Sequence, residues 1–272
     1  MHNTDFSVLM SVYYKERPEQ LRESLDSVFS QTLLPTEVVL VEDGPLTPGL
    51  YNEIERFKSA CPQLKVVRLH ENGGLGKALN EGLKHCSYDL VARMDSDDIC
   101  FPDRFRIQVA FMTSHPGIDI CSSWMEEFEG DTANVISIKK LPETHAEIAE
   151  YIKTRNPLNH PAVIFRKSAV LKAGGYKHFP LFEDYYLWAR MMVNGSSFAN
   201  IPESLLHFRT SPEMMKRRGG IRYAITSYKF QNELHHLGLI TRLQAIKSSV
   251  IRGIVYILPN NLRKLIYSKL LR

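Results

Sequence analysis

The 272-residue chain lacks the sequence features that mark several common protein classes. Its four cysteines, Cys61, Cys86, Cys100 and Cys121, form no Cys-x-x-Cys pair, so neither a zinc site nor a disulfide framework is supported. No apolar run approaches the ~18 residues of a transmembrane helix, and the first residues lack the basic start of a signal peptide. Low-complexity segments and internal repeats are also missing. These absences predict a folded cytoplasmic protein.

Two familiar phosphate-binding motifs are incomplete in this chain. Gly74-x-Gly76 is followed by Leu79 where a dinucleotide-binding motif requires glycine. Gly76-Lys77-Ala78 lacks the upstream glycine of a P-loop. Two interpretations of this glycine-rich segment therefore stay open: a helix start that lets a ligand approach the backbone closely, and a purely structural turn.

Charge is distributed unevenly, although the net charge is only +4. Residues 214–272 contain 12 Lys and Arg but a single acid, Glu233, whereas residues 1–213 contain 22 Lys and Arg and 29 acids. The acidic body argues against general binding of nucleic acid. The basic tail predicts contact with an anionic surface.

Apolar runs and helical patterns alternate over the first 100 residues. Strands are predicted at about 6–13, 38–41, 65–69 and 89–94, with helices at about 17–29, 50–60 and 74–86. This alternation predicts an α/β fold with a doubly wound, mostly parallel sheet. The alternation then stops. Helices at about 102–114, 144–154 and 182–191 and strands at 118–124, 135–139, 198–201 and 205–209 predict a mixed extension of the same domain.

Each of the first four predicted strands ends in polar residues. These ends are Tyr13–Glu16, Glu42–Gly44, Asn72–Gly74 and Asp95–Asp97. Because parallel strands present their carboxyl ends at one edge of a sheet, the four loops are expected to converge on one crevice of nucleotide size.

The acidic cluster at residues 95–98 is the most informative stretch. Side chains alternate along an extended backbone, so Asp95 and Asp97 are expected to point the same way and share one hard cation or polyol. Asp98 would point the other way and cap a helix that starts within 99–105, with Pro102 in its first turn. The alternative interpretation of the cluster is a solvated turn between strand and helix.

A second pair of acids, Glu183 and Asp184, stands at the start of a predicted helix. Acids there stabilise a helix N-terminus, which is a sufficient structural role. If they face the crevice, one of them is a suitable general base. Further along, His207 precedes a run of cations at 216–218 and is a candidate contact for a diphosphate.

Taken together, these stretches resemble the family 2 glycosyltransferases of the GT-A fold, particularly the bacterial members that build surface polysaccharides. The resemblance covers about residues 5–210, in the expected order. The matching segments are Ser7–Tyr13, Val41–Gly44, Asn72–Asn80, Met94–Asp98 followed by Pro102–Arg104, Asn159–Pro161 and Phe182–Trp188.

The resemblance implies an inverting transfer from a nucleoside-diphosphate sugar, often UDP-linked, to a lipid-linked oligosaccharide or polysaccharide, assisted by Mg²⁺ or Mn²⁺. It implies that residues 1–210 form the GT-A domain, in which about residues 1–100 bind the nucleotide and about residues 101–210 bind the acceptor. A basic helical region would follow at 211–272. The residue roles carried over by position fall into four groups. They are Asp184 with Glu183 as catalytic acids; Val12, Tyr13, Glu16, Asp43, Gly74, Lys77, Asp95 and Ser96 at the nucleotide; Asp97, Asp95, Asp98 and His207 at the metal; and His160 and Arg209 at the acceptor or diphosphate.

The tail carries a separate signal. At 100° per residue, one apolar stripe contains Leu239, Leu243, Ile246, Val250, Ile254 and Ile257. A basic amphipathic helix of this kind lies on anionic membranes, which predicts peripheral attachment to the inner face of the cell membrane. The alternative is a helix packed on the body as a last core element.

Three other functions remain open at this point. A Mg²⁺-dependent phosphohydrolase with an aspartyl nucleophile at Asp95 or Asp97 would also place acids at a strand end, but it gives Glu183 and Asp184 no role. A catalytically silent nucleotide-sugar-binding protein would bind donor without turnover. A glycoside hydrolase uses paired carboxylates but needs no nucleotide crevice.

Overall fold

The computed structural model describes residues 5–211 and 220–257. The cations at 216–218, the side chain of Ile257 and the final segment 258–272 lie outside the described residues, together with the predictions made for them.

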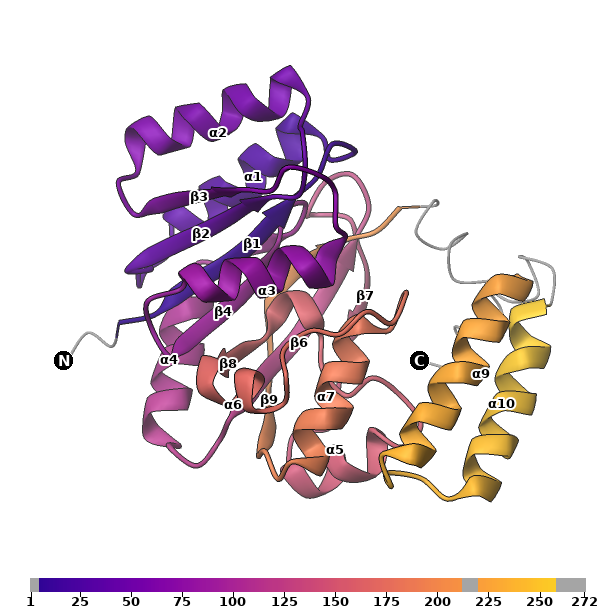
Figure 1. Ribbon diagram of the computed structural model, residues 1–272. Helices are drawn as coiled ribbons and strands as arrows, with labels where there is room; N and C mark the ends of the chain where they lie inside the picture. Colours follow the sequence, from indigo (N-terminus) through magenta and orange to yellow (C-terminus); the bar gives the residue numbers. More distant parts are fainter. Residues whose placement is uncertain (1–4, 212–219, 258–272) are drawn as a thin grey trace.

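One mixed sheet forms the centre of the molecule (Figure 1). Its strands are β1 (Ser7–Val12), β2 (Glu37–Glu42), β3 (Leu64–Arg68), β4 (Leu90–Asp95), β5 (Ile99–Cys100), β6 (Ile120–Phe128), β7 (Val135–Lys139), β8 (Ile164–Arg166) and β9 (Phe198–Arg209). The strand order is β3-β2-β1-β4-β8-β6-β9-β5, and β7 pairs with β6. The pairs β1–β2, β1–β4 and β2–β3 are parallel, whereas β8 is antiparallel to β4. The predicted α/β fold with a parallel half and a mixed extension is confirmed.

Helices cover both faces of the parallel half. The helical elements of the described residues are α1 (Pro18–Phe29), α2 (Pro48–Ala60), α3 (Leu75–His85), α4 (Arg104–Ser114), α5 (His145–Tyr151), a 3₁₀ turn (His160–Ala162), α6 (Lys167–Lys172), α7 (Glu183–Val193), α9 (Ile221–His236) and α10 (Arg242–Ile257). In β1, Leu9 joins the core beneath α3 and α7, while Val8 and Met10 join the core beneath α1 and α4. Burial of both faces explains why these strands have continuous apolar runs rather than alternating ones.

Two predicted boundaries are wrong. Residues 99–100 form strand β5 against β9, with Ile99 opposite His207, so α4 begins only at Arg104 and Pro102 lies before it. The two short strands predicted at 198–201 and 205–209 are one strand, β9, because β6 extends to Phe128 and offers a partner along its whole length. Register shifts in this pairing accommodate the residues around Pro202.

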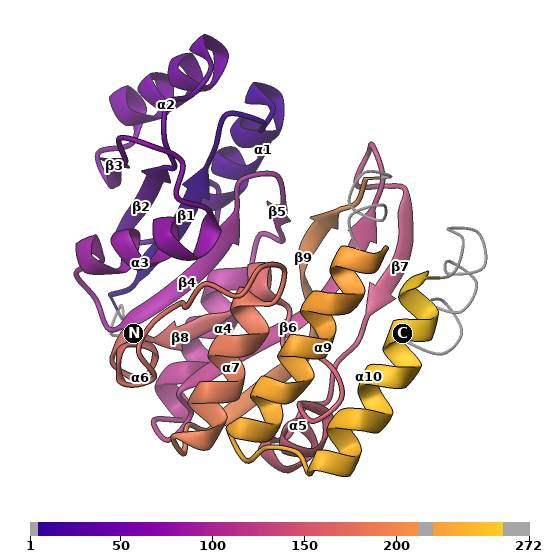
Figure 2. The same cartoon turned by 45° about the vertical axis from the view of Figure 1, so that its right-hand side comes forward.

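Residues 220–257 of the tail form an antiparallel helical hairpin beside α7 (Figure 2). The Gly220 N–H donates to the Tyr256 carbonyl over 2.9 Å, which joins the start of α9 to the end of α10. The Phe230 ring of α9 stacks on Phe182 with centroids 4.7 Å apart, and Arg252 of α10 donates to the Thr154 carbonyl. One face of the tail therefore packs on the body, as the second interpretation of the tail predicted. None of the helices in the described ranges has both the length and the apolarity to cross a bilayer.

Candidate functional site

The carboxyl ends of β1, β2 and β4 meet the first turns of α3 and α7 at one edge of the sheet. In the strand register Ser11 lies beside Asp95, and Val12 lies beside Glu42. The Asp43 N–H continues this ladder by donating to the Val12 carbonyl over 2.8 Å. The expected convergence of polar strand ends is therefore present.

Asp43 fastens the glycine-rich segment to this edge. Its buried carboxylate accepts the Gly73 N–H at 2.7 Å, the Gly74 N–H at 3.0 Å and the Asn72 side-chain amide at 3.0 Å. Gly74 has φ of 84°, a left-handed conformation that favours glycine, and it caps α3. Asp43 thus organises the loop on which a nucleotide would rest, and its contact with the base stays a prediction.

The other residues predicted at the nucleotide lie along the same edge. Val12 ends β1 and is buried, and the Glu16 N–H closes a turn onto the Tyr13 carbonyl at 3.1 Å. Lys77 is exposed in the first turn of α3, and Ser96 is buried directly after β4.

Three carboxylates form the acidic cluster at the end of β4. Asp95, Asp97 and Asp98 each place an oxygen within 4.8 Å of the others. Burial and the neighbouring Asp95 carboxylate raise the pKa of Asp97 to about 6. Burial, followed by the charges of Asp97 and Asp95, raises the pKa of Asp98 well above its ordinary value. Clustered carboxylates whose charges oppose one another are suited to a hard divalent cation such as Mg²⁺ or Mn²⁺.

Asp98 does not point away from the cluster and does not cap a helix, contrary to the prediction. Strand β4 ends at Asp95, so the alternation of side chains no longer applies at Asp98, three residues later. One Asp98 oxygen accepts the Arg209 N–H at 2.8 Å. The other oxygen is buried without a partner. This unpaired oxygen is a further sign that the cluster fits a cation.

Arg93 is a buried partner of the acidic cluster that the sequence did not predict as a site residue. Its side chain lies in β4, is 1% exposed and donates to the Asp95 carboxylate. Its Nε and Nη1 atoms have no hydrogen-bond partner. The signal in the sequence was an arginine inside an otherwise apolar strand, since a charged residue is rarely buried without a specific partner.

Arg209 and His207 brace the cluster's loop rather than extend the cluster. The Arg209 guanidinium donates to the Asp97 carbonyl at 2.8 Å and to the Glu23 carboxylate at 2.5 Å. The His207 ring stacks on Phe101 with centroids 4.1 Å apart, and its Nδ1 faces Glu126 at 3.5 Å. Within the described residues the metal-competent group comprises only the three aspartates, so this arrangement gives no support to His207 as a ligand.

Glu183 and Asp184 occupy the first turn of α7, and Tyr176 lies within reach of the charges of both Asp184 and Asp95. The Asn156 amide donates to Asp184 Oδ2 over 2.6 Å. Burial raises the pKa of Glu183. A Cβ placed on Gly76 would lie 3.7 Å from the Glu183 Cγ, so the N-termini of α3 and α7 lie close together. Asn156 was not predicted as a site residue. It lies 28 positions before Asp184 in the chain, and only the fold brings the two side chains together.

His160 and Tyr176 lie near both the acidic cluster and Asp184, because the charge of Arg93 acts on both rings and the charges of Asp95 and Asp184 act on Tyr176. His160 Nε2 lies 2.9 Å from the Tyr176 hydroxyl. Burial, and then the charge of Arg93, lower the pKa of His160 well below its ordinary value, so the imidazole is neutral. Asn80 fixes Tyr176 by accepting its N–H at 2.8 Å and donating to its carbonyl at 2.6 Å. The acceptor or diphosphate role of His160 stays a prediction, and its hydrogen-bond partner in the structure is Tyr176.

Comparisons with known proteins agree with this architecture. A sequence model of the family described as "Glycosyl transferase family 2" matches residues 7–172. A UDP-Gal:alpha-D-GlcNAc-diphosphoundecaprenol beta-1,3-galactosyltransferase of Escherichia coli is 41% identical over 267 residues, covering 98% of this chain and 96% of the relative. The amylovoran biosynthesis glycosyltransferase AmsE of Erwinia amylovora is 39% identical, with coverage of 98% and 96%.

A solved structure extends the likeness to the fold. Residues 1–349 of S. aureus TarS, crystallised in complex with UDP-GlcNAc, superpose with a TM-score of 0.69 at 19% identity. The match covers 99% of this chain and 76% of that one.

Proposed function

The chain belongs to glycosyl transferase family 2 and is a glycosyltransferase; from that premise we propose that it moves a sugar from a UDP-linked donor, with inversion, to a lipid-linked oligosaccharide or polysaccharide. The observation that carries the proposal is a three-carboxylate cluster together with an oriented carboxylate, Asp184, where the charges of Asp95 and Asp184 both act on Tyr176. A phosphohydrolase or a silent binding protein would use the first group and leave the second without a role.

Asp95, Asp97 and Asp98 would hold Mg²⁺ or Mn²⁺. When bound, the cation would neutralise the charge that develops on the diphosphate leaving group. The chain's own part is to keep the three carboxylates in place. Arg93 does so through Asp95, and Arg209 does so through the Asp97 carbonyl and one Asp98 oxygen.

Asp184 is the proposed general base. Asn156 occupies its Oδ2, which leaves Oδ1 to accept the proton of the acceptor hydroxyl. One base on the face opposite the leaving group gives a single displacement and therefore an inverted anomeric centre. Glu183, next to Asp184 in the first turn of α7, would contact the acceptor.

The donor and acceptor in this proposal follow the E. coli relative, whose name specifies UDP-galactose and a sugar on diphosphoundecaprenol. An identity of 41% over nearly the whole of both chains supports a similar substrate class. A lipid-linked acceptor also supports the expected place of the protein, peripheral on the inner face of the cell membrane.

The proposal is tested by incubating the full chain with UDP-hexoses, Mn²⁺ and a synthetic GlcNAc-diphospholipid. The expected result is a disaccharide product with a β linkage from an α-linked donor, read by NMR, and one UDP released for each sugar transferred. A retained anomeric configuration would refute the inverting mechanism. Release of inorganic phosphate without transfer, with a covalent aspartyl phosphate, would favour the phosphohydrolase.

A further inference from the structure

Large apolar side chains stand exposed on the outer face of the tail hairpin. On α10, Leu243, Ile246, Val250 and Ile254 are 53–76% exposed. Their spacing of three and four residues places them on one stripe of the helix. On α9, three further apolar side chains are 50–68% exposed with the same spacing: Ile221, Ile225 and Tyr228.

This exposure is not explained by packing of the hairpin on the body. The opposite side of α10 is already buried through Ala245, Val255 and Tyr256. A helix that only completed the core would show polar residues on its outward face. Neighbouring exposed apolar side chains in this number mark an interaction surface.

The charges around the stripes indicate the partner. Exposed Arg222 and Lys229 flank the stripe of α9, and exposed Arg242 and Lys247 flank that of α10. Among residues 220–257 the single acid is Glu233, which accepts the Tyr186 hydroxyl at 2.7 Å. A second copy of this face would bring like charges together, whereas an anionic lipid leaflet is complementary in both charge and apolarity.

We propose that the outer face of α9 and α10 is a membrane-docking surface that lies in the plane of an anionic leaflet. Its apolar stripes enter the boundary between headgroups and acyl chains, and its cations meet the lipid phosphates. This deepens the proposed function, on which it rests for the presence of a lipid-linked acceptor. It assigns attachment to a folded hairpin with apolar insertion rather than to basic charge alone.

Sedimentation with lipid vesicles tests the surface. The full chain is mixed with vesicles of phosphatidylcholine, with or without phosphatidylglycerol. The wild type is expected to bind the anionic vesicles, and the double variant Ile246→Gln/Val250→Gln is expected to bind about tenfold more weakly, since two apolar side chains leave the interface without a change of charge. The control Leu34→Gln/Leu171→Gln removes two equally exposed apolar side chains elsewhere and is expected to bind as the wild type does.

A second variant separates charge from insertion. Arg242→Gln/Lys247→Gln should weaken binding to anionic vesicles about tenfold and leave the weak binding to neutral vesicles unchanged. The proposal is overturned if the wild type stays in solution with anionic vesicles at low salt. It is also overturned if the wild type is a dimer in solution that Ile246→Gln/Val250→Gln converts to monomers, because the face would then bind a second copy.

Thermal stabilisation by UDP with Mn²⁺, measured on the same samples, keeps this proposal separate from the proposed function. Stabilisation without vesicle binding would refute the docking surface alone. Vesicle binding without stabilisation by any nucleoside diphosphate would refute the proposed function alone.

Discussion

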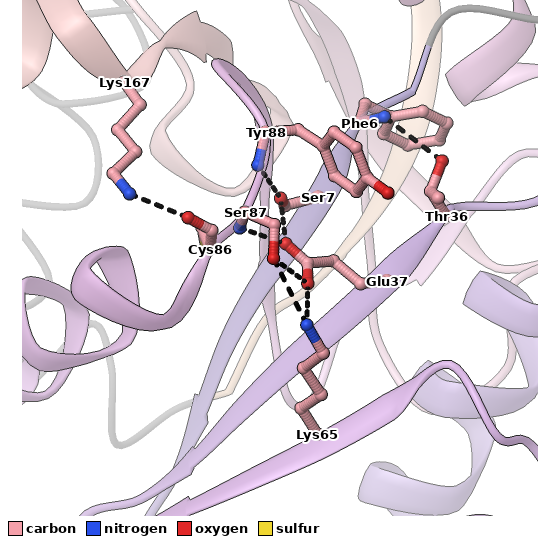
Figure 3. A network of polar contacts seen from close by, with 9 residues as sticks. All are labelled: Phe6, Ser7, Thr36, Glu37, Lys65, Cys86, Ser87, Tyr88 and Lys167. Atoms are coloured by element: carbon pink, nitrogen blue, oxygen red, sulfur yellow. Dashed lines mark hydrogen bonds and ion pairs between the residues drawn. The ribbon is translucent and has the colours of Figure 1, made fainter.

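Buried carboxylates at the two ends of the parallel strands differ in how many hydrogen-bond donors surround them. At the amino end of β2, Glu37 is 3% exposed and both of its oxygens have donors (Figure 3). The Ser7 hydroxyl donates at 2.6 Å, the Ser87 hydroxyl at 3.0 Å, and the Ser87 N–H and the Lys65 ammonium also donate. Burial alone would raise the pKa of Glu37, but Lys65, Ser7 and Ser87 together hold it below its ordinary value.

The acidic cluster at the carboxyl end of the same sheet shows the reverse. Burial raises the pKa of Asp97 and Asp98, one Asp98 oxygen has no partner, and two donor atoms of Arg93 are unused. In the Glu37 network the fold supplies the donors, whereas the carboxylates of the acidic cluster are left to oppose one another and are suited to a ligand. Asp43, at the carboxyl end, is also supplied with donors, so the comparison separates the Glu37 network from the acidic cluster rather than every carboxylate at the two ends.

The largest expected effect lies at the candidate site. Asp184→Asn keeps an oxygen for the Asn156 amide but removes the base, so kcat for sugar transfer should fall about 10³-fold. Steady-state transfer kinetics and titration with UDP and Mn²⁺ measure this, and the affinity for UDP should not change. Glu183→Gln is the neighbouring control and should cost much less. An equal loss in both variants would show that Asp184 is not the base.

A substitution at Glu37 should change the stability of the protein rather than its affinity for the nucleotide. Glu37→Gln replaces a charged acceptor in a satisfied network, which should lower the free energy of unfolding by about 1–3 kcal/mol. Urea titration measures this loss. Stabilisation by UDP and Mn²⁺ should remain that of the wild type. A selective loss of nucleotide affinity would mean that the Glu37 network and the acidic cluster are not separate.

Asn156→Ala sharpens the assignment on the acceptor side. Loss of the amide removes the hydrogen bond that orients Asp184 through Oδ2, so kcat should fall about tenfold while KM for the donor stays constant. Transfer kinetics at saturating acceptor provide the test. A change in KM for the donor with unchanged kcat would place Asn156 at the nucleotide instead.

The smallest expected effect is a pair of opposite pH dependences in metal-free protein. The lowered pKa of Glu37 gives stability that is present above its ordinary pKa of 4.5 and is lost as pH falls through the folded value. The raised pKa of Asp97 acts in the other direction. Between 3.8 and about 6 the folded state holds a proton that the unfolded chain has released, so stability falls as pH rises through this window.

Unfolding in urea with EDTA at successive pH values measures both contributions. Asp97→Asn should remove the fall toward neutral pH and make the metal-free protein about 1 kcal/mol more stable at pH ~7. Glu37→Gln should remove the loss on the acid side. If Asp97→Asn leaves the pH dependence unchanged, Asp97 does not titrate in this window.

The parallel half of the fold was predictable from sequence because its signals are local. Runs such as 38–41 are apolar throughout, since both faces of the sheet are covered, and polar residues follow immediately where the strands stop. The short strand β5 and the full length of β9 were not predictable in this way. Each depends on pairing with a distant strand, as Ile99 with His207 and Trp124 with Ser204.

The residues of the candidate site also divide into those with a local signal in the sequence and those that depend on distant contacts. Asp95, Asp97 and Asp184 were assigned because acids stand next to predicted strand and helix ends, and their roles stay predictions. Strand alternation predicted the wrong direction for the Asp98 side chain, although the family resemblance placed Asp98 at the metal. Arg93, Asn156 and Tyr176 were missed, because their positions arise from contacts across the fold. Arg209 was assigned to the acceptor or diphosphate, and this stays a prediction; its guanidinium donates to the Asp97 carbonyl, the Gly130 carbonyl and Glu23.

The most direct test of the acidic cluster is calorimetric titration of UDP in the presence and absence of Mn²⁺, with wild type and Asp97→Asn. The wild type is expected to bind UDP much more tightly with Mn²⁺, Asp97→Asn is expected to lose this gain, and Glu37→Gln is expected to keep it. Binding of UDP that is indifferent to Mn²⁺, or a gain that survives in Asp97→Asn, would contradict the assignment of the acidic cluster to a metal-bound diphosphate.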